Sequence, residues 1–570
     1  MLRSEFSLTG TVVDHLSRLL MCGAFGNFLR VTQTTASGAE IAERRLMGPL
    51  RLWEIIFLAA LSLSILAGAA MESRKEYFGN DELITSILVS NPSFSEMWSA
   101  IRRGGELNPP LYFILEWVMA RVFGNGELPL RAISGISIAL GGLVLYFTLR
   151  PSVGPRIAAL AIALVLGLSR DVFFFAYQAR YYGVLFLLVS LGIFLLMRLT
   201  ADRPVTWRDY LLIFLVHAAI VYLHLYGLIY SGVLFVAMAA MDILRGKLRW
   251  GLLGAVLAAW LSFCAWLPAT LQQLKSVSHG VYTPPNFLKL GFFVEELALQ
   301  TPLALVLLFI SLLGCLALIS ARPCPATEEI AGCSTPAAWA ALGVVALALM
   351  SVPVSTWLAS HVLTPPPYMR RYMFPCMAAW VLVLALMMVA VFRLPAVNPP
   401  FKFRVSPRLW ELAWLGVLIF CVGFQPMRAR KNPARAATPF VDDDFGYKDL
   451  PIVFENSWYF VQRAYYGQGR EYVLLIDRDA AEADPGWYTK CTQRFFQAWY
   501  PQYHRANISH VADLPENFLA VDDDSTKTFE WVFTHHPELT KQLLGARKAE
   551  VEVHGEARTY LVHNSAATKK

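Results

Sequence analysis

The sequence predicts a polytopic α-helical membrane protein with a small α/β domain at its C-terminal end. Of its 570 residues, 56% are hydrophobic and only 16% are charged, which is too apolar for a soluble protein of this length. Apolar segments of about 20 residues, the length of a membrane-spanning helix, recur between residues 53 and 425. After Gln425 the chain becomes polar, and short apolar runs alternate with helical patterns. The runs predict strands at 451–454, 472–476, 518–521, 551–553 and 560–562, and the helical patterns lie at 458–466, 487–499 and 529–544. We therefore expect a leader over residues 1–50, a transmembrane domain over 51–425 and an α/β domain over 426–570.

Apolar length and flanking charge predict eleven transmembrane helices. The expected segments are 53–71, 129–149, 155–170, 181–199, 210–224, 226–244, 251–270, 302–320, 337–358, 373–392 and 409–425. The short loops that are rich in Lys and Arg all fall on one side, which is cytoplasmic by the positive-inside rule. We therefore expect a multi-pass protein of the inner (plasma) membrane. Its N-terminal leader would be cytoplasmic and in part disordered, and its C-terminal domain periplasmic.

The formal net charge of +7 does not indicate nucleic-acid binding, because most Lys and Arg residues flank the apolar segments. Four of the eight cysteines lie inside apolar segments, where a cysteine is usually a small hydrophobic residue. Cys324 and Cys333 share one loop but lack the close spacing and nearby histidines of a zinc site. We expect no metal site from the cysteines.

The first outer loop, residues 72–128, holds the adjacent acids Asp81 and Glu82 and a Pro-Pro-started apolar segment, 109–123. This segment is only fifteen residues long and contains two charged residues, so it suits a helix in the membrane surface better than a span. If the segment 109–123 were a span, the later arginine-rich loops would lie outside the cell membrane, against the charge bias. We expect juxtamembrane helices in this loop.

Unusual polar residues gather in the outer loops and form a carboxylate cluster ringed by basic and aromatic side chains. Guanidinium groups suit phosphate, and aromatic rings suit a sugar face or an isoprenoid chain. A carboxylate near a basic patch can remove a proton from an acceptor hydroxyl while a phosphate leaves. Structural alternatives exist: Asp81 and Glu82 could complement a helix dipole, and Arg180 and Arg371 could be interfacial anchors. His224 alone could be a capped histidine.

Six motifs follow one another along the chain: Asp81-Glu82, Asn108 to Tyr112, Phe123 to Arg131, Tyr177 to Gly183, His224 to Gly227 and Arg371-Tyr372. Their order resembles the GT-C glycosyltransferases, in the bacterial branch related to protein mannosyltransferases and the lipid A aminoarabinose transferase (family 39-like). The resemblance covers roughly residues 50–395.

The resemblance implies a GT-C fold, a polyprenyl-phosphate sugar donor and inverting transfer. Asp81 and Glu82 would be the catalytic carboxylates, and Asp81 would act as the general base. Arg180 and Arg371 would contact the donor phosphate, and the remaining substrate-binding candidates are Tyr182, His224, Tyr372, Asn108 and Tyr112. Relatives often have an acidic residue at the position of Gln178. The amide of a glutamine cannot hold a divalent cation as a carboxylate does. We assign no metal ligand, and a divalent cation stays a candidate cofactor.

We therefore predict a membrane glycosyltransferase, a hexosyl- or pentosyltransferase of the cell envelope. Its partners would be the lipid-linked donor, membrane lipids and a glycan, lipid or protein acceptor, and no nucleic acid. Two alternatives stay open: a lipid-linked sugar transporter or flippase, and an inactive GT-C-like scaffold.

Overall fold

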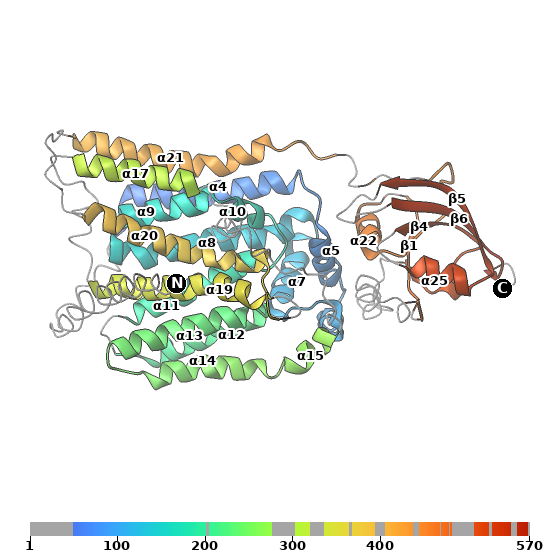
Figure 1. Cartoon of the computed structure of the whole chain (residues 1–570), viewed down its shortest axis with the longest axis horizontal. Coiled ribbons are helices and arrows are strands. Elements are labelled where there is room, and N and C mark those ends of the chain that lie inside the picture. Colours follow the sequence, from blue (N-terminus) through green and yellow to red (C-terminus); the bar gives the residue numbers. More distant parts are fainter. Residues whose placement is uncertain are drawn as a thin grey trace, which may run out of the picture.

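The structure is a computed structural model that describes residues 49–200, 204–275, 303–319, 336–363, 367–393, 405–436, 440, 444–467, 469–477, 479–480, 507–523, 527–548 and 556–567. Nearly all of the expected leader lies outside the described residues. The described chain forms a bundle of long helices and a smaller sheet domain beyond one end of that bundle (Figure 1).

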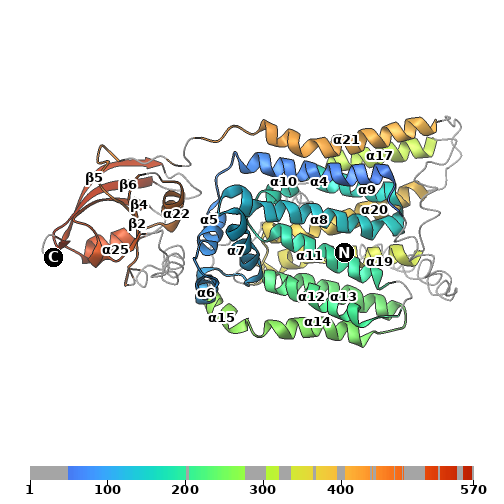
Figure 2. The same cartoon turned by 180° about the vertical axis from the view of Figure 1, so that it is seen from behind.

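The bundle consists of apolar helices that run side by side (Figures 1 and 2). Among the described residues, six segments are long and apolar enough to cross a bilayer. They are α4 (Leu52–Ser73), α8 (Glu127–Val153), α13 (Gly227–Leu244), α19 (Pro336–Ala359), η4 (Arg370–Cys376) with α20 (Met377–Arg393), and α21 (Pro407–Lys431). Shorter helices of 17 residues complete the bundle: α11 (Tyr182–Arg198), α12 (Trp207–Leu223) and α17 (Leu303–Ile319). The polytopic helical fold is confirmed, whereas the count of eleven spans stays a prediction.

Two further apolar segments are bent, and counting each as one span gives up to eight candidates in the described chain. The first runs through α9 (Pro155–Ile162) and η3 (Ala163–Gly167) and turns by 70° into α10 (Arg170–Ala176). The side chain of Ser169 accepts a hydrogen bond from the Val172 amide at 3.2 Å, which caps the new helix. The second bends by 56° between α14 (Trp250–Phe263) and α15 (Leu267–Lys275).

The first loop forms short helices at one end of the bundle, between the bundle and the sheet domain (Figures 1 and 2). They are α5 (Asn80–Val89), α6 (Phe94–Ala100), η2 (Ile101–Gly105) and α7 (Leu111–Phe123). We call this end of the bundle the loop end. Helix α7 has 13 residues and buries Tyr112, Phe113 and Glu116, while Val118 and Val122 are exposed on its other side. This amphipathic helix is too short to span a bilayer.

The C-terminal domain is a six-stranded sheet in the order β3-β2-β1-β4-β6-β5. Its strands are β1 (Ile452–Phe454), β2 (Tyr472–Leu475), β3 (Asn507–Ser509), β4 (Asn517–Asp523), β5 (Leu539–Lys548) and β6 (Glu556–Asn564). Strand β1 pairs in parallel with β2 and β4, and β6 runs antiparallel to both β4 and β5. Helices α22 (Ser457–Tyr466) and α25 (Thr528–His535) accompany the sheet. The expected small α/β domain is confirmed.

One local prediction in this domain is wrong. The apolar pattern favours a helix over Phe529 to Leu544, but the helix ends at His535 and the chain continues as strand β5. Pro537 explains the break, because the residue before a proline avoids the helical conformation. The expected helix at 487–499 and the expected strand at 551–553 lie outside the described residues.

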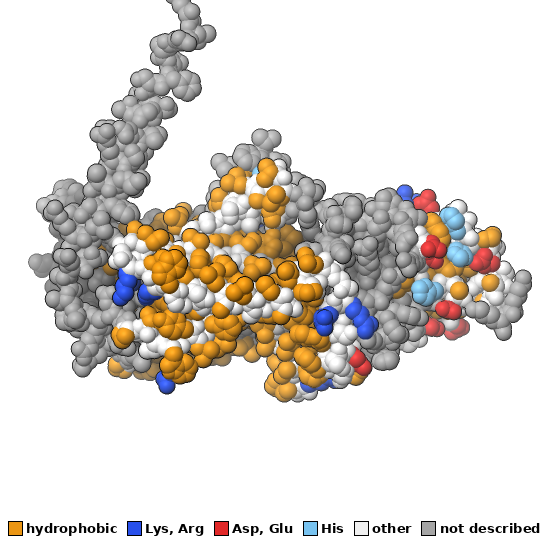
Figure 3. Space-filling model, turned by 90° about the horizontal axis from the view of Figure 1, so that it is seen from below, with side chains coloured by type: hydrophobic (Ala, Val, Ile, Leu, Met, Phe, Trp, Pro, Cys, Tyr) orange, Lys and Arg blue, Asp and Glu red, His pale blue; other side chains and the backbone are white. Residues whose placement is uncertain are grey.

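The surface of the two parts differs in character. Figure 3 shows a bundle surface that is largely hydrophobic with Lys and Arg towards its ends, whereas Asp, Glu and His gather on the C-terminal domain. Large apolar side chains such as Leu63, Leu261 and Leu347 are exposed on different helices of the bundle. A continuous apolar surface of this kind is what lipid chains cover.

Candidate functional site

Four segments that are distant in sequence meet at the loop end of the bundle. They are the first turn of α5, the turn between η2 and α7, the segment 177–182 between α10 and α11, and the start of η4, which carries Arg371. The turn between α12 and α13 joins them through His224, whose ring lies against those of Tyr181 and Tyr372. The bend between η3 and α10 matters here, because the segment that follows α10 contacts α5 through Ala179 and Arg180.

Asp81 and Arg371 form an ion pair at the accessible side of this site. Arg371 Nη1 lies 2.8 Å from Asp81 Oδ2, and the side chains retain 37% and 35% of their exposure, respectively. They are 290 residues apart in sequence. Most other polar side chains of the site are buried, so this pair marks the place where a ligand can enter.

The neighbouring acid, Glu82, has a different environment. Its carboxylate receives two hydrogen bonds from Arg131, Nε to Oε1 and Nη2 to Oε2, both at 2.8 Å, and both side chains are about 1% exposed. It also accepts the backbone amides of Ala179 at 2.7 Å and Gly79 at 2.9 Å. The contact with Gly79 caps α5, because Glu82 is the third residue of that helix. The two adjacent acids therefore have different roles. Glu82 links α5 to α8 and to the segment 177–182, whereas Asp81 faces the opening of the site.

Arg180 fixes the position of Asp81 from the inside. Its Nη1 donates to the backbone oxygen of Asp81 at 3.1 Å and to Thr85 Oγ1 at 3.2 Å. The same atom lies 3.1 Å from Glu106 Oε2, and both side chains are buried. The Nδ2 atom of Asn108 donates to Glu106 Oε1 at 3.0 Å. A buried arginine therefore connects two carboxylate-bearing loops.

Aromatic rings form the wall beside the ion pair. The His224 ring lies 4.2 Å from the Tyr181 ring and 4.8 Å from the Tyr372 ring, centroid to centroid. The Tyr182 ring lies 4.6 Å from that of Tyr181 and 6.4 Å from that of Tyr372. The guanidinium carbon of Arg371 is 5.4 Å from the centre of the Tyr372 ring. The wall and the arginines therefore belong to one continuous cluster.

Several buried polar atoms of this cluster have no hydrogen-bond partner among the described residues. These atoms are Arg180 Nε, Arg371 Nε, His224 Nε2 and the hydroxyl oxygens of Tyr181 and Tyr182. Buried polar groups in folded proteins are nearly always hydrogen-bonded, so a group of such atoms in one place is typical of a site that binds a polar ligand. Two of the five are arginine N–H groups, which can only donate.

His224 completes this set as a donor. Its Nδ1 accepts the backbone amide of Tyr226 at 2.9 Å, so the proton of the neutral ring lies on Nε2. Burial and the nearby charges of Arg180 and Arg371 hold the pKa of His224 well below its usual value, which keeps the ring neutral. The partnerless Nε2–H is therefore a neutral donor beside two cationic ones. This arrangement suits an anion with several oxygen atoms, such as a phosphate.

Asp81 is ionised in this environment. Burial would raise the pKa of its carboxyl group, but the charges of Arg180 and Arg371 and the hydrogen bond from Arg371 outweigh burial and lower it. A carboxylate held in this way is a weak base until its cationic partner moves away.

Tyr112 lies one layer beneath the aromatic wall. Its hydroxyl donates to Glu116 Oε1, and its ring packs edge-on against Tyr181 at 5.9 Å. Burial raises the pKa of Glu116 well above its usual range, although the hydrogen bond from Tyr112 opposes this effect. Burial therefore favours the protonated form of Glu116 more than in an exposed glutamate. This pair supports the site and does not face its opening.

Two glycines allow the close approach of backbones near the site. A Cβ atom at Gly183 would lie 2.6 Å from the backbone oxygen of Ser134 in α8. A Cβ atom at Gly227 would lie 2.0 Å from the backbone oxygen of Ile220, across the turn that holds His224. Side chains at these two positions would push apart the helices that carry the aromatic wall.

The structure thus brings together all of the site residues that the sequence singles out. Asp81, Arg180, Tyr182, His224, Arg371 and Tyr372 line the cluster, while Glu82, Asn108 and Tyr112 support it. Sequence reasoning missed Glu106, Tyr181 and Tyr226. Glu106 stands two residues before Asn108, and Tyr181 lies between two residues that were selected, so both could have been found as neighbours. No group of three His, Cys, Asp or Glu side chains in the described chain is arranged to hold a metal ion.

Comparisons with known proteins gave structural matches only. No protein-family model and no curated protein sequence matches the chain. The fold is similar to ArnT from Cupriavidus metallidurans in the apo state, with a TM-score of 0.48 and 14% identity over 90% of this chain and 98% of that one. ArnT from the same organism bound to undecaprenyl phosphate gives a TM-score of 0.46 and 13% identity over the same shares.

A further match is the archaeal oligosaccharyltransferase AglB from Archaeoglobus fulgidus, in complex with an inhibitory peptide and a dolichol-phosphate. Its TM-score is 0.43, with 11% identity over 82% of this chain and 69% of that one.

Proposed function

We propose that the chain is a membrane glycosyltransferase of the GT-C type that uses a polyprenyl-phosphate sugar donor. The observation that carries this proposal is the ion pair of Asp81 with Arg371 beside a cluster of buried donors that lack partners among the described residues. The donors suit the phosphate of the donor lipid, and the carboxylate suits the acceptor hydroxyl. Arg180 and Arg371 are the proposed phosphate contacts, with the Nε2–H of His224 as a neutral third.

The reaction needs one proton acceptor and one stabilised leaving group. Asp81 takes the proton of the acceptor hydroxyl while that oxygen bonds to the anomeric carbon of the sugar. The bond between this carbon and the phosphate oxygen breaks, and the polyprenyl phosphate leaves with the electron pair. The attack comes from the side opposite to the leaving group, so the anomeric configuration inverts. The arginines stabilise the negative charge that develops on the phosphate.

Donor binding would also activate the base. Arg371 is bound to Asp81, and its charge and hydrogen bond lower the pKa of the carboxyl group. A donor phosphate competes for the same guanidinium group, and a guanidinium that turns to the phosphate gives the carboxylate back its basicity. The base would therefore become effective only when the donor is present, which limits hydrolysis and futile proton transfer.

Glu82 has a structural role in this proposal, because both of its oxygens are engaged by Arg131 and backbone amides. Tyr182 and Tyr372 form the wall against which the sugar or the first isoprenoid unit packs. We place the site on the periplasmic side, in accordance with the charge bias of the loops. The acceptor would be a glycan, lipid or protein of the envelope.

Mass spectrometry of envelope glycans provides the test. Cells that carry the wild-type protein should contain a modified glycan, lipid or protein that is absent without the gene and absent with Asp81→Asn. A glycan profile that is identical in wild-type, deletion and Asp81→Asn cells contradicts the proposal. Glu530→Gln, which removes an exposed carboxylate on α25 of the C-terminal domain, is the matched control and should retain the modification.

A further inference from the structure

The C-terminal domain contacts the segment that leads into Asp81. Helix α22 of this domain packs on α5, and both views of the molecule show it on the side of the domain that faces the loop end (Figures 1 and 2). Its last residue, Tyr466, reaches the backbone of the first loop: the hydroxyl oxygen accepts the amide of Phe78 at 2.7 Å. Phe78 is three residues before Asp81. The same hydroxyl donates to Glu127 Oε1 at the start of α8.

Further contacts hold the same segment from the same side. The ring of Tyr77 lies edge-on to that of Tyr466 at 4.8 Å, and its hydroxyl donates to the backbone oxygen of Ala436 at 2.6 Å. The guanidinium carbon of Arg435 lies 3.6 Å from the centre of the Tyr77 ring, and Arg435 also pairs with Glu127 at 2.5 Å. All of these partners belong to the C-terminal domain or the segment leading to it, except Glu127.

The opposite side of the segment is held by the bundle. Arg131 donates to the backbone oxygens of Glu76 and Tyr77, both at 2.8 Å, while its other bonds include those to Glu82. The segment between α4 and α5 is therefore held from two sides. Arg131 of the bundle binds its carbonyl oxygens, and Tyr466 of the C-terminal domain binds the Phe78 amide; we call this set of contacts the clamp. The path from this clamp to the proposed base is short, because only the N-cap Gly79 and Asn80 lie between Phe78 and Asp81.

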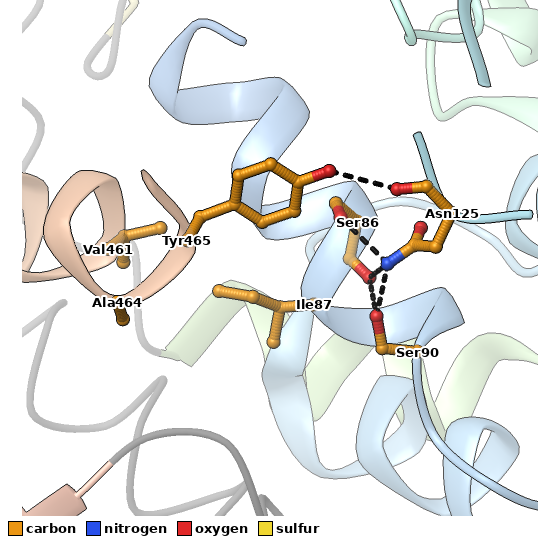
Figure 4. A pocket seen from close by; sticks show the side chains of 7 residues that line it. All are labelled: Ser86, Ile87, Ser90, Asn125, Val461, Ala464 and Tyr465. Atoms are coloured by element: carbon orange, nitrogen blue, oxygen red, sulfur yellow. Dashed lines mark hydrogen bonds between the residues drawn. The ribbon is translucent and has the colours of Figure 1, made fainter. Parts of the chain in front are cut away.

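The packing around this clamp is open, so the hydrogen bonds matter. A cavity of about 310 Å³ lies between α5 and α22, lined by Ser86, Ile87, Ser90, Asn125, Val461, Ala464 and Tyr465. Figure 4 shows the Tyr465 hydroxyl turned to the backbone of Asn125, with which it forms a hydrogen bond of 2.9 Å. Because the interface is not closely packed along α5, its contacts are concentrated at the end that holds Phe78.

We infer that Tyr466 is a positioning residue of the transferase, and that the C-terminal domain keeps Asp81 in place through it. This inference rests on the proposed function, since it assigns the domain a role in that reaction. Tyr466 does not contact Asp81; it fixes the backbone from which α5 starts, and thereby the distance from Asp81 to Arg371 and to the acceptor. Small displacements of a catalytic group are costly, about 100-fold in rate for a shift of about 1 Å.

Two variants on the same helix separate this role from general stability. Tyr466→Phe keeps the ring against Tyr77 but removes the acceptor of the Phe78 amide. Tyr465→Phe is the matched control, because it keeps the ring that packs on Phe78 at 5.5 Å and removes only the bond to Asn125. Both should be purified as the full chain in detergent or nanodiscs.

Hydrogen exchange measured by mass spectrometry tests the clamp without any substrate. Peptides that cover residues 76–82 should exchange at least about tenfold faster in Tyr466→Phe and at the wild-type rate in Tyr465→Phe, since a lost acceptor frees the amide. Unchanged exchange in Tyr466→Phe overturns the inference, whether or not the protein proves to be a transferase.

Kinetics then test the positioning. With a saturating polyprenyl-phosphate sugar donor, Tyr466→Phe should lower kcat by about 10- to 100-fold with little change in the KM of the donor. The acid limb of its kcat/KM profile, which reports the enzyme before the donor binds, should also move to higher pH, because Asp81 is then less firmly paired with Arg371. Faster exchange together with wild-type kcat and an unchanged pH profile overturns the inference. If wild-type protein transfers no sugar, the proposed function fails, and the exchange experiment still decides on the clamp.

Discussion

Arg371 Nη1 lies 2.8 Å from Asp81 Oδ2, although the two residues are separated by 290 positions and belong to opposite parts of the bundle sequence. The pair is accessible, whereas the ion pairs of Arg131 with Glu82 and of Arg180 with Glu106 are buried. An accessible pair can open without a large loss of stability, because such pairs contribute only about 0–1 kcal/mol. This property makes it suited to exchange partners with a substrate.

Asp81→Asn should abolish transfer and strengthen donor binding at the same time. Loss of a general base typically lowers the rate about 100- to 10,000-fold. The amide no longer competes for Arg371, so the Kd of polyprenyl phosphate should fall. Isothermal titration calorimetry on the purified variant measures this Kd, and weaker binding than in the wild type would contradict the proposed exchange of partners.

The pH dependence of transfer should follow the pKa of Asp81. Because that pKa is lowered, the ionised form is present throughout the usual aspartate range and above it, and it is lost only as the pH falls through the lowered value. The value of kcat/KM for the donor, which reports the enzyme before the donor binds, should therefore persist below a pH of about 4, the ordinary pKa of an aspartate. Arg371→Gln removes one of the charges that lower the pKa of Asp81. The acid limb of the pH profile should therefore move to higher pH. Arg370→Gln, whose partner is Asp171, should leave the limb in place.

Glu82→Ala should destabilise the protein and not only inactivate it. The change leaves the buried guanidinium of Arg131 without its carboxylate, which costs about 3–5 kcal/mol in comparable cases. The variant should give a lower melting temperature and less monodisperse protein on size-exclusion chromatography. Asp81→Asn should melt close to the wild type, because its side chain is partly exposed. Equal melting of Glu82→Ala and wild type would refute the structural role.

Gly183→Ala tests the close contact of α11 with α8. The new methyl group would collide with the backbone of Ser134, and overpacking of this kind costs about 1–3 kcal/mol. Gly254→Ala is the control, because nothing lies within 4 Å of a Cβ atom at that position in α14. The first variant should lower the melting temperature and the second should not. Equal melting temperatures of the two variants would contradict the importance of the contact between α11 and α8.

Much of the architecture could be predicted because hydrophobic length and charge act locally. The strands at Ile452–Phe454, Tyr472–Leu475 and Asn517–Asp523 appear close to where alternating apolar runs indicate them. Strand β5 was missed because the pattern after Phe529 has a helical period, and pairing with β6 decides its conformation. The span predicted over 155–170 ends close to the bend, but helix α10 (Arg170–Ala176) lies where we expected an outer loop.

The candidate site was predictable as a set of residues but not as a set of contacts. Loop position and motif order placed Asp81, Arg180 and Arg371 on one side. The sequence could not show that Glu82 is enclosed by Arg131 whereas Asp81 is open, because adjacent residues of a helix point about 100° apart and tertiary packing decides which faces the core. The clamp by Tyr466 joins residues 388 positions apart, a contact that no local pattern reveals.

The amphipathic helix α7 has a consequence for how substrates reach the site. Its exposed side carries Leu115, Val118 and Val122, while Tyr112 on its buried side packs against Tyr181. In the proposed transferase this apolar side would rest on the bilayer and would set the height of the cluster at the level of the lipid headgroups. A lipid-linked donor would then arrive by lateral diffusion within the leaflet, and its surface density, rather than its concentration in bulk solution, would govern the rate of encounter.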